Sequence, residues 1–247
     1  FQLLRRARLA DDALMLTRRR VVVISLFAWL PLLAFAALAG DVLGGDVAVP
    51  FLMDVDVHAK FLLAMPLLVV AELVVHQRMR TLAASFLERN LVPEAAAARL
   101  DAAVGPAYRM RNSISAELLL IAVVYVVGVT IVWRQYMTLD AATWYATPTA
   151  DGLRLTFAGA WYGYVSLPLF QFLLCRWYYR IFIWARLLWQ VSRIKLTLVP
   201  THPDRVGGLG FLATISHAFV PLLMAHGALL AGNVANQIFH AGANLTQ

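Results

Sequence analysis

The sequence predicts an all-α integral membrane protein with about five transmembrane helices and a short cytoplasmic helical hairpin. Of its 247 residues, 61% are hydrophobic and 14% are charged, whereas a soluble domain carries about 45–50% apolar and about 25% charged residues. The mean hydropathy is +0.70. Apolar stretches of about 20 residues recur along the chain, and each is long enough to cross a hydrocarbon core of roughly 30 Å.

The apolar stretches define the spans within a single transmembrane domain, residues 1–247. We expect spans at about 21–40, 57–75, 114–133, 155–175 and 211–239, the fourth continuing as a helix to about 195. Pro31 and Pro66 fall inside the first two spans and should kink them, which helices in lipid tolerate when neighbouring groups satisfy the freed carbonyl. The first residue is Phe1 rather than Met, and the chain stops at Gln247 without a terminating pattern. We therefore expect the polypeptide to continue beyond both ends.

A more polar segment, residues 76–112, separates the second and third spans. It is rich in Ala, Arg and Glu and has a helical pattern. Pro93 and Glu94 suit the first two positions of a helix, and Gly105-Pro106 predicts a break. We expect this segment to be the cytoplasmic hairpin.

The basic residues indicate the orientation in the membrane. Of 21 Lys and Arg, six lie in residues 1–20, six between Arg78 and Arg111, and six between Arg176 and Arg205. A five-span arrangement places these three groups on one side. The other side holds Lys60, Arg134 and Arg154, together with Asp41, Asp46, Asp54, Asp56, Asp140 and Asp151. Because basic loops stay in the cytoplasm, we expect a cytoplasmic N-terminus, contact of these loops with anionic lipid head groups, and no nucleic-acid partner.

Several classes of protein chemistry are excluded by the residues present. The single cysteine, Cys175, permits no disulfide and no cysteine-based metal cluster within one chain. Gly-x-Ser-x-Gly, His-Glu-x-x-His and Walker motifs are all missing from the sequence. His202, Asp204 and His217 offer too few ligands for a metal site. We therefore expect neither catalysis nor a bound metal.

Glu72 is the first candidate functional residue, because a carboxylate near the end of a span is costly unless it is paired or faces water. His76 lies on the same face, four residues later. These two residues are consistent with a proton or cation path. The alternative is that Glu72 reaches cytoplasmic water or Arg78, and that Glu117 similarly pairs with Arg109 or Arg111.

The cytoplasmic half of the fourth helix carries a cationic face beside aromatic residues. Its arginines are Arg176, Arg180, Arg186 and Arg193, and they fall within an arc of about 140° at helical periodicity. One interpretation is an interfacial anchor, in which arginines reach lipid phosphates and tryptophans lie among the head groups. The other is that several copies of this face line a vestibule that attracts anions.

The loop before the fifth span is the most distinctive string in the chain: His-Pro-Asp-Arg-Val-Gly-Gly-Leu-Gly-Phe-Leu, residues 202–212. Gly207 and Gly208 permit backbone conformations closed to other residues. We expect Asp204 to cap the turn. The loop is consistent with a tight structural turn, or with an anion site in which Arg205 and free amides at the helix start bind the ligand.

This string resembles one carried by uncharacterised bacterial multi-pass inner-membrane proteins. The resemblance covers mainly the loop and its two flanking helices. It implies a bacterial inner-membrane location, and it implies no activity and no catalytic residue.

The fifth span contains a row of polar side chains. His226, Asn233 and His240 are spaced by seven residues, and Asn236 lies nearby. Hydrogen bonding between helices explains such a row, as does a hydrated pore or substrate path. Bis-histidine ligation of haem b is a further alternative, although it requires partners such as His76 or His58 on another helix.

These features leave three function classes. The leading hypothesis is a homo-oligomeric channel or transporter for ions or small solutes, because five spans seldom enclose a path unaided. The second is an accessory or scaffold subunit of a larger membrane complex, which would dock its partner on the basic helix face. The third is a b-type haem membrane protein.

Overall fold

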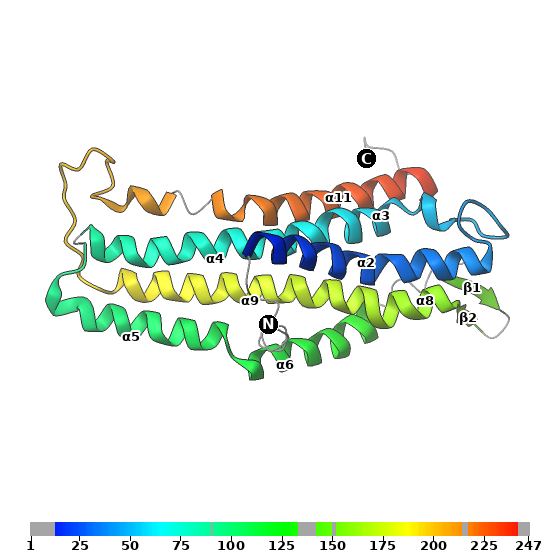
Figure 1. The fold of residues 1–247 in the computed structure, drawn as a ribbon, viewed down its shortest axis with the longest axis horizontal. Helices are drawn as coiled ribbons and strands as arrows, with labels where there is room; N and C mark the ends of the chain where they lie inside the picture. The colour runs from blue at the N-terminus through cyan, green and yellow to red at the C-terminus, as the bar shows by residue number, and fades with distance from the viewer. Residues whose placement is uncertain (1–12, 90, 133–141, 150–151, 214–216, 242–247) are drawn as a thin grey trace. The chain divides into compact units, whose positions relative to one another are not determined.

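The computed structural model describes residues 13–89, 91–132, 142–149, 152–213 and 217–241 (Figure 1). Helices make up most of this part of the chain, and one two-stranded sheet accompanies them. The predicted helical class is therefore confirmed. The chain divides into two compact units. Unit 1 comprises Phe1–Val70, Val123–Leu173 and Leu222–Gln247, and unit 2 comprises Ala71–Ala122 and Leu174–Pro221.

The apolar helices make this a candidate membrane protein by length and composition. Two segments of the described chain are long and apolar enough to cross a bilayer, Arg18–Ala39 and Leu209–His240. A third counts if Ala95–Arg111 and Ile114–Gly128, which meet at a bend of 51°, form one span. The expected span at 57–75 is helical, and the one at 155–175 is helical only from Phe157, because Leu155 ends a strand. Each is divided into shorter elements whose longest helices carry charged residues.

Unit 1 is built around the first long helix. Its elements are α2 (Ala13–Ala39), η1 (Phe51–Met53), α3 (Val55–His58), η2 (Ala59–Ala64), the start of α4 (Met65–Glu88), η3 (Val124–Val132), β1 (Ala146–Thr149), β2 (Gly152–Leu155), α8 (Phe157–Trp161), η4 (Tyr162–Ser166), the start of α9 (Leu167–Ser192) and most of α11 (Val220–Ala241). Helix α2 packs against η2, α8 and η4. Ala28, Leu32 and Ala36, spaced four residues apart, form its fully buried face. The Ser166 hydroxyl donates to the Ala28 carbonyl oxygen at 2.7 Å.

Two π-helical segments of unit 1 each end two residues before a proline. η2 ends two residues before Pro66, and η4 ends two residues before Pro168. Inside a regular α-helix, proline removes one hydrogen bond and its ring meets the carbonyl four residues earlier. The wider π turn accommodates that ring. The prolines therefore locate the distortions, and these distortions face each other through Lys60 and Tyr162.

The β1–β2 hairpin is an element that the sequence analysis does not predict. The strands are antiparallel, and Ala146 pairs with Leu155. The following helix, α8, begins at a Thr156 cap, whose hydroxyl accepts the Gly159 amide at 3.0 Å and donates to the Trp144 carbonyl at 2.9 Å. A Cβ at Gly159 would lie 1.8 Å from the Tyr145 carbonyl oxygen, so glycine is required there. These contacts fix residues 143–145 against the start of α8.

Unit 2 contains the polar helices. It consists of the rest of α4, α5 (Glu94–Arg111), α6 (Ile114–Val123) up to Ala122, the rest of α9, η5 (Leu209–Leu212) and η6 (His217–Phe219). Its buried apolar core is formed by Phe86, Leu91, Val92, Leu100, Val191, Ile194 and Phe211. The Phe86 and Phe211 rings meet edge to face at 5.1 Å.

The predicted break at Gly105-Pro106 is wrong. Pro106 lies inside α5, which continues to Arg111. The bend instead falls at Asn112–Ser113, where the Ser113 hydroxyl accepts the amide of Ala116 at 3.3 Å and starts α6. The Ser113 cap satisfies an amide of the first turn of α6 that has no helical partner, so a new helix can begin there. Pro106 removes only one hydrogen bond of α5, which does not end the helix.

Candidate functional site: an arginine–glutamate cluster

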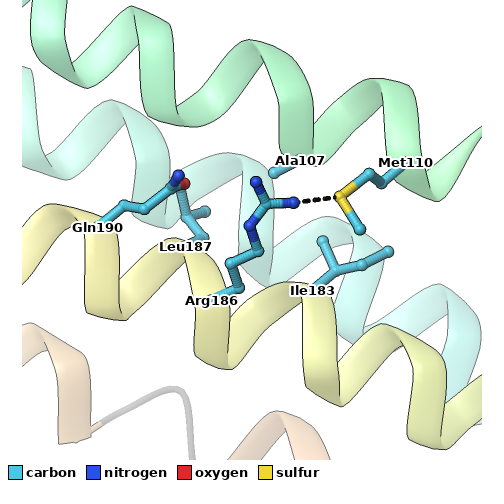
Figure 2. A pocket seen from close by; sticks show the side chains of 6 residues that line it. All are labelled: Ala107, Met110, Ile183, Arg186, Leu187 and Gln190. Atoms are coloured by element: carbon cyan, nitrogen blue, oxygen red, sulfur yellow. Dashed lines mark hydrogen bonds between the residues drawn. The ribbon is translucent and has the colours of Figure 1, made fainter.

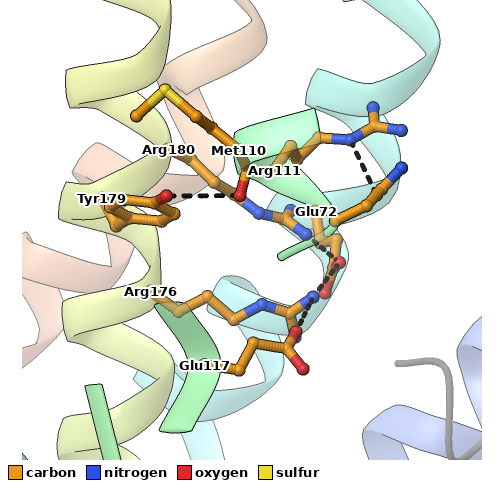
Figure 3. A network of polar contacts seen from close by, with 8 residues as sticks. Glu72, Met110, Arg111, Glu117, Arg176, Tyr179 and Arg180 are labelled. Carbon is orange, nitrogen blue, oxygen red and sulfur yellow. Dashed lines mark hydrogen bonds and ion pairs between the residues drawn. The ribbon is translucent and has the colours of Figure 1, made fainter. Parts of the chain in front are cut away.

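Two glutamates and two arginines of unit 2 meet in a part-buried group (Figure 3). Arg176 Nη2 lies 3.2 Å from Glu72 Oε1, and Arg180 Nη2 donates to the same oxygen. Glu117 Oε1 lies 3.7 Å from Arg176 Nη2. We refer to these four residues as the Arg–Glu cluster. It joins α4, α6 and α9 through charge.

Helix α9 positions the two arginines. Arg176 and Arg180 are four residues apart, so successive turns present both guanidinium groups to Glu72. The Arg180 guanidinium also lies over the Trp177 ring, 5.6 Å from its centroid, in the geometry of a cation–π contact. The Tyr179 hydroxyl donates to the Met110 carbonyl at 3.2 Å and ties α9 to α5 (Figure 3).

The side chains described around the cluster carry an excess of positive charge. Arg111, at the end of α5, interacts electrostatically with both Arg180 and Glu72. Counting it, three guanidinium groups accompany two carboxylates. The exposed fractions of the Arg176 and Arg180 side chains are 12% and 18%. Part-buried guanidinium groups bind carboxylate, phosphate and other small anions through paired N–H donors, so this group has the chemistry of an anion site.

The structure thus places Glu72 and Glu117 beside residues that lie far away in sequence. Glu72 is paired with α9, more than 100 residues away, and the ion pair found for Glu117 is also with Arg176. The side chain of His76 lies outside the described part of the chain. The predicted arginine face of the fourth helix is divided, because Arg186 and Arg193 are exposed and lie apart from the cluster.

Arg186 borders a shallow hollow between α5 and α9 (Figure 2). Its lining residues are Ala107, Met110, Ile183, Arg186, Leu187 and Gln190, and its empty space is about 160 Å³. Arg186 Nη1 lies 2.7 Å from the Met110 sulfur. Arg193 lies over the Trp189 ring at 5.2 Å, as expected of an aromatic and cationic helix end near lipid head groups.

The glycine loop binds its own carboxylate. Asp204 Oδ1 accepts the amides of Val206 and Gly208 at 3.0 Å each, and Oδ2 accepts the Gly210 amide at 2.8 Å. Gly207 and Gly208 have φ of 69° and 99°, so glycine is favoured at both. Asp204 therefore caps the turn as expected, and these three amides are already occupied by an anion that belongs to the chain.

Hydrogen bonding controls the charge of Asp204. Desolvation alone would raise the pKa of this carboxyl, but the bonds from Gly208, Gly210 and Val206, together with His202, lower it well below its usual range. His202 Nδ1 accepts the Asp204 amide N–H at 3.2 Å and lies 2.8 Å from Asp204 Oδ1. Arg205 is exposed with φ of 57° and follows this carboxylate directly.

The polar row of α11 does not share one environment. The Asn233 side chain is exposed and accepts from Gln237 at 2.9 Å, and His226 Nδ1 lies 2.8 Å from its own helix carbonyl at Leu222. His240 Nε2 lies 2.9 Å from the Met53 carbonyl oxygen. Asn236 is half-buried, with an Oδ1 that has no hydrogen-bond partner.

Another part of α11 packs closely on α3 and the start of η2, because a Cβ at Gly232 would lie 2.5 Å from the Ala59 Cβ and 3.4 Å from the Asp56 Cα. His58, the histidine considered as a haem partner, accepts the Trp29 indole N–H on Nδ1 at 3.0 Å. That nitrogen is therefore occupied within the protein. The other ring nitrogen, Nε2, is buried without a partner.

Three charged residues of unit 1 are buried, whereas the sequence predicts only that they lie on the non-cytoplasmic side of the membrane. They are Asp54, Asp56 and Lys60, with exposed fractions of 4%, 8% and 5%. Lys60 Nζ lies 2.8 Å from Asp56 Oδ2. The four-residue spacing of these two residues is a helical ion-pair signal that could have identified them. We call these three residues the Asp–Lys cluster.

No family model matches the chain, and comparison with curated proteins and with solved structures likewise finds no match.

Proposed function

We propose that the protein is a homo-oligomeric membrane channel or transporter for small anions, in which the Arg–Glu cluster is the anion site. The observation that carries this proposal is the convergence of two guanidinium groups on one oxygen of Glu72. Charged residues on membrane helices are costly and commonly mark ion pathways. The arginine excess selects negative charge over positive.

The proposed mechanism makes Glu72 an internal substitute for the permeant ion. With no anion bound, the Glu72 carboxylate neutralises Arg176 and Arg180. An arriving chloride or small carboxylate competes for the same N–H donors, and Glu72 then moves aside. Glu117, at 3.7 Å from Arg176, keeps part of the charge balanced during exchange. Several weak, competing contacts of this kind allow an ion both to enter and to leave.

The membrane arrangement belongs to the same proposal. Five crossings would place 18 of the 21 basic residues on one side of the membrane, and this asymmetry favours a cytoplasmic N-terminus. The resemblance of the loop at 202–212 favours the bacterial inner membrane. Five helices seldom enclose a path alone, so we place the path between copies of the chain.

Anion efflux from proteoliposomes tests the proposal. Purified protein should release trapped chloride faster than empty liposomes do, and Arg180→Gln should lower the rate by about tenfold or more, because the site loses one of the two guanidinium groups that would bind the anion. Arg193→Gln is the matched control, since it removes an exposed arginine that directly follows the same helix. If Arg180→Gln is folded and conducts at the wild-type rate, the cluster is not the anion site. If wild-type protein releases no small anion, the function is wrong.

A further inference from the structure

The Asp–Lys cluster of unit 1 lies where α3 continues into η2. Asp54 caps the N-terminus of α3, and its Oδ1 accepts the Val57 amide at 3.3 Å. Asp56 and Lys60 follow, one turn apart, and form an ion pair at 2.8 Å. All three residues are more than nine-tenths buried. Burial of this degree removes most of the water that stabilises charge on a surface.

Aromatic side chains enclose these charged groups. The Trp144 indole N–H donates to Asp54 Oδ2 at 2.9 Å, and Lys60 Nζ donates to the Tyr162 hydroxyl at 3.3 Å. The Trp144 and Tyr162 rings lie 5.5 Å apart, and both side chains are almost completely buried. Phe51, also fully buried, meets the Trp144 ring edge to face. Each charged group therefore has a directional partner inside an apolar enclosure.

The titratable groups near Asp54 come from four parts of unit 1. The groups are Asp56, His58 and Lys60 from α3 and η2, Tyr145 from the segment before the hairpin, Tyr162 from η4, and His240 of α11 at the Met53 carbonyl. Among the described groups, Asp54 interacts electrostatically with Asp56 and Lys60. One ammonium thus serves two carboxylates, and its direct contact is with Asp56.

Lys60 neutralises only one of the two carboxylates, and a proton is the ligand that neutralises the other. A buried carboxylate without a cationic partner costs several kcal/mol, and such groups usually bind a proton instead. Desolvation raises the pKa of Asp54, and the neighbouring Asp56 charge adds to the rise, against the opposing effects of Trp144, Val57 and Lys60. Each Asp54 oxygen accepts one hydrogen bond, which leaves a second lone pair available to hold a proton.

We propose that Asp54, Asp56 and Lys60 form a proton-binding site, in which Asp54 takes up one proton from water while Asp56 stays paired with Lys60. Uptake changes the net charge of the cluster from −1 to 0. The site differs from the Arg–Glu cluster in its residues and in its ligand, so the proposal stands whether or not the protein carries anions.

Infrared spectroscopy of the purified protein in nanodiscs tests this site directly. A protonated buried carboxyl gives a carbonyl stretching band that disappears on ionisation. We expect this band in the wild type at mildly acid pH, with a midpoint above the ordinary aspartate value of about 3.9, and its loss in Asp54→Asn. Asp46→Asn, which changes an exposed aspartate of the preceding loop, should leave the band unchanged. Lys60→Met should raise the midpoint by about 1–3 pH units, because a stabilising positive charge is removed.

The wild-type titration decides the matter even if a variant does not fold. Absence of a titrating band between pH 4 and pH 8 (roughly the range open to a raised carboxyl) overturns the proposal. A band that persists in folded Asp54→Asn overturns the assignment to Asp54. Loss of the band on replacing choline chloride by sodium chloride at constant pH assigns the site to a metal cation, and this too overturns it.

Discussion

Replacing Lys60 with methionine removes the buried ammonium while preserving most of the side-chain length. Lys60 is 5% exposed, and its ammonium is 2.8 Å from Asp56. In the variant, Asp56 remains in the same apolar enclosure without its cation. It must either stay ionised and unpaired, or bind a proton when the protein folds.

The cost of binding a proton to Asp56 determines how much unfolding free energy the variant loses. An ordinary aspartic acid titrates near pH 3.9, and each pH unit above that value costs about 1.4 kcal/mol to hold the proton. The cost is therefore about 4 kcal/mol at pH 7 and about 1.5 kcal/mol at pH 5. The value at pH 7 agrees with the roughly 3–5 kcal/mol lost when one partner of a buried ion pair is removed. Since the proton is held more tightly in the folded state, the variant loses stability as pH rises.

Unfolding in mixed micelles with increasing SDS, followed by tryptophan fluorescence, measures the free energy of unfolding at both pH values. Lys195→Met, at an exposed lysine, is the control and should cost less than about 0.5 kcal/mol. Asp56→Asn combined with Lys60→Met should recover part of the loss because no unpaired charge remains. A loss of under about 1 kcal/mol at pH 7, or equal losses at pH 5 and pH 7, would show that Lys60 does not neutralise a buried Asp56 carboxylate.

Three further predictions concern separate parts of the chain. Thr156→Ala should cost about 1 kcal/mol of unfolding free energy, because it removes the cap of α8, and Thr156→Ser should retain most of it in the same SDS titration. Asp204→Asn should speed amide hydrogen exchange at Gly210, because the new NH₂ group cannot accept the bond that Oδ2 accepts. In the wild type, the lowered pKa of Asp204 means that the contribution of its carboxylate to the stability of this loop is complete above about pH 4 and is lost as pH falls further. Amide exchange in the loop, measured relative to the intrinsic rate, should therefore accelerate only in strong acid. Single cysteines can be introduced at Arg19, Arg99 and Arg193 in a Cys175→Ala background. All three should be labelled from the cytoplasmic side, and labelling from opposite sides would contradict five crossings.

Local features of the fold could be predicted because they depend on neighbouring residues. Apolar runs predicted the helices, Asp204 and the glycines predicted a capped turn, and Pro93 predicted the start of α5 to within one residue. The hairpin was missed although Asp151-Gly152 is a turn signal between residues of strand character. Pro106 misled because proline weakens a helix without always ending it.

The pairings that form the Arg–Glu cluster could not be predicted from one sequence. Glu72 meets Arg176 and Arg180 over separations of 104 and 108 residues, and no periodicity encodes which helix lies beside which. Lys60 differs, because its partner Asp56 is one turn away. That pair was missed because its position near a loop suggested exposure to water, whereas the Trp144 segment covers it.

The reversal potential of the purified protein in a planar bilayer distinguishes an anion path through the Arg–Glu cluster from a cation path. Under a potassium chloride gradient, an anion path lined by Arg176 and Arg180 predicts a current that reverses close to the equilibrium potential of chloride. Reversal close to the equilibrium potential of potassium would contradict the account, as would a bilayer that contains oriented, folded protein and carries no current.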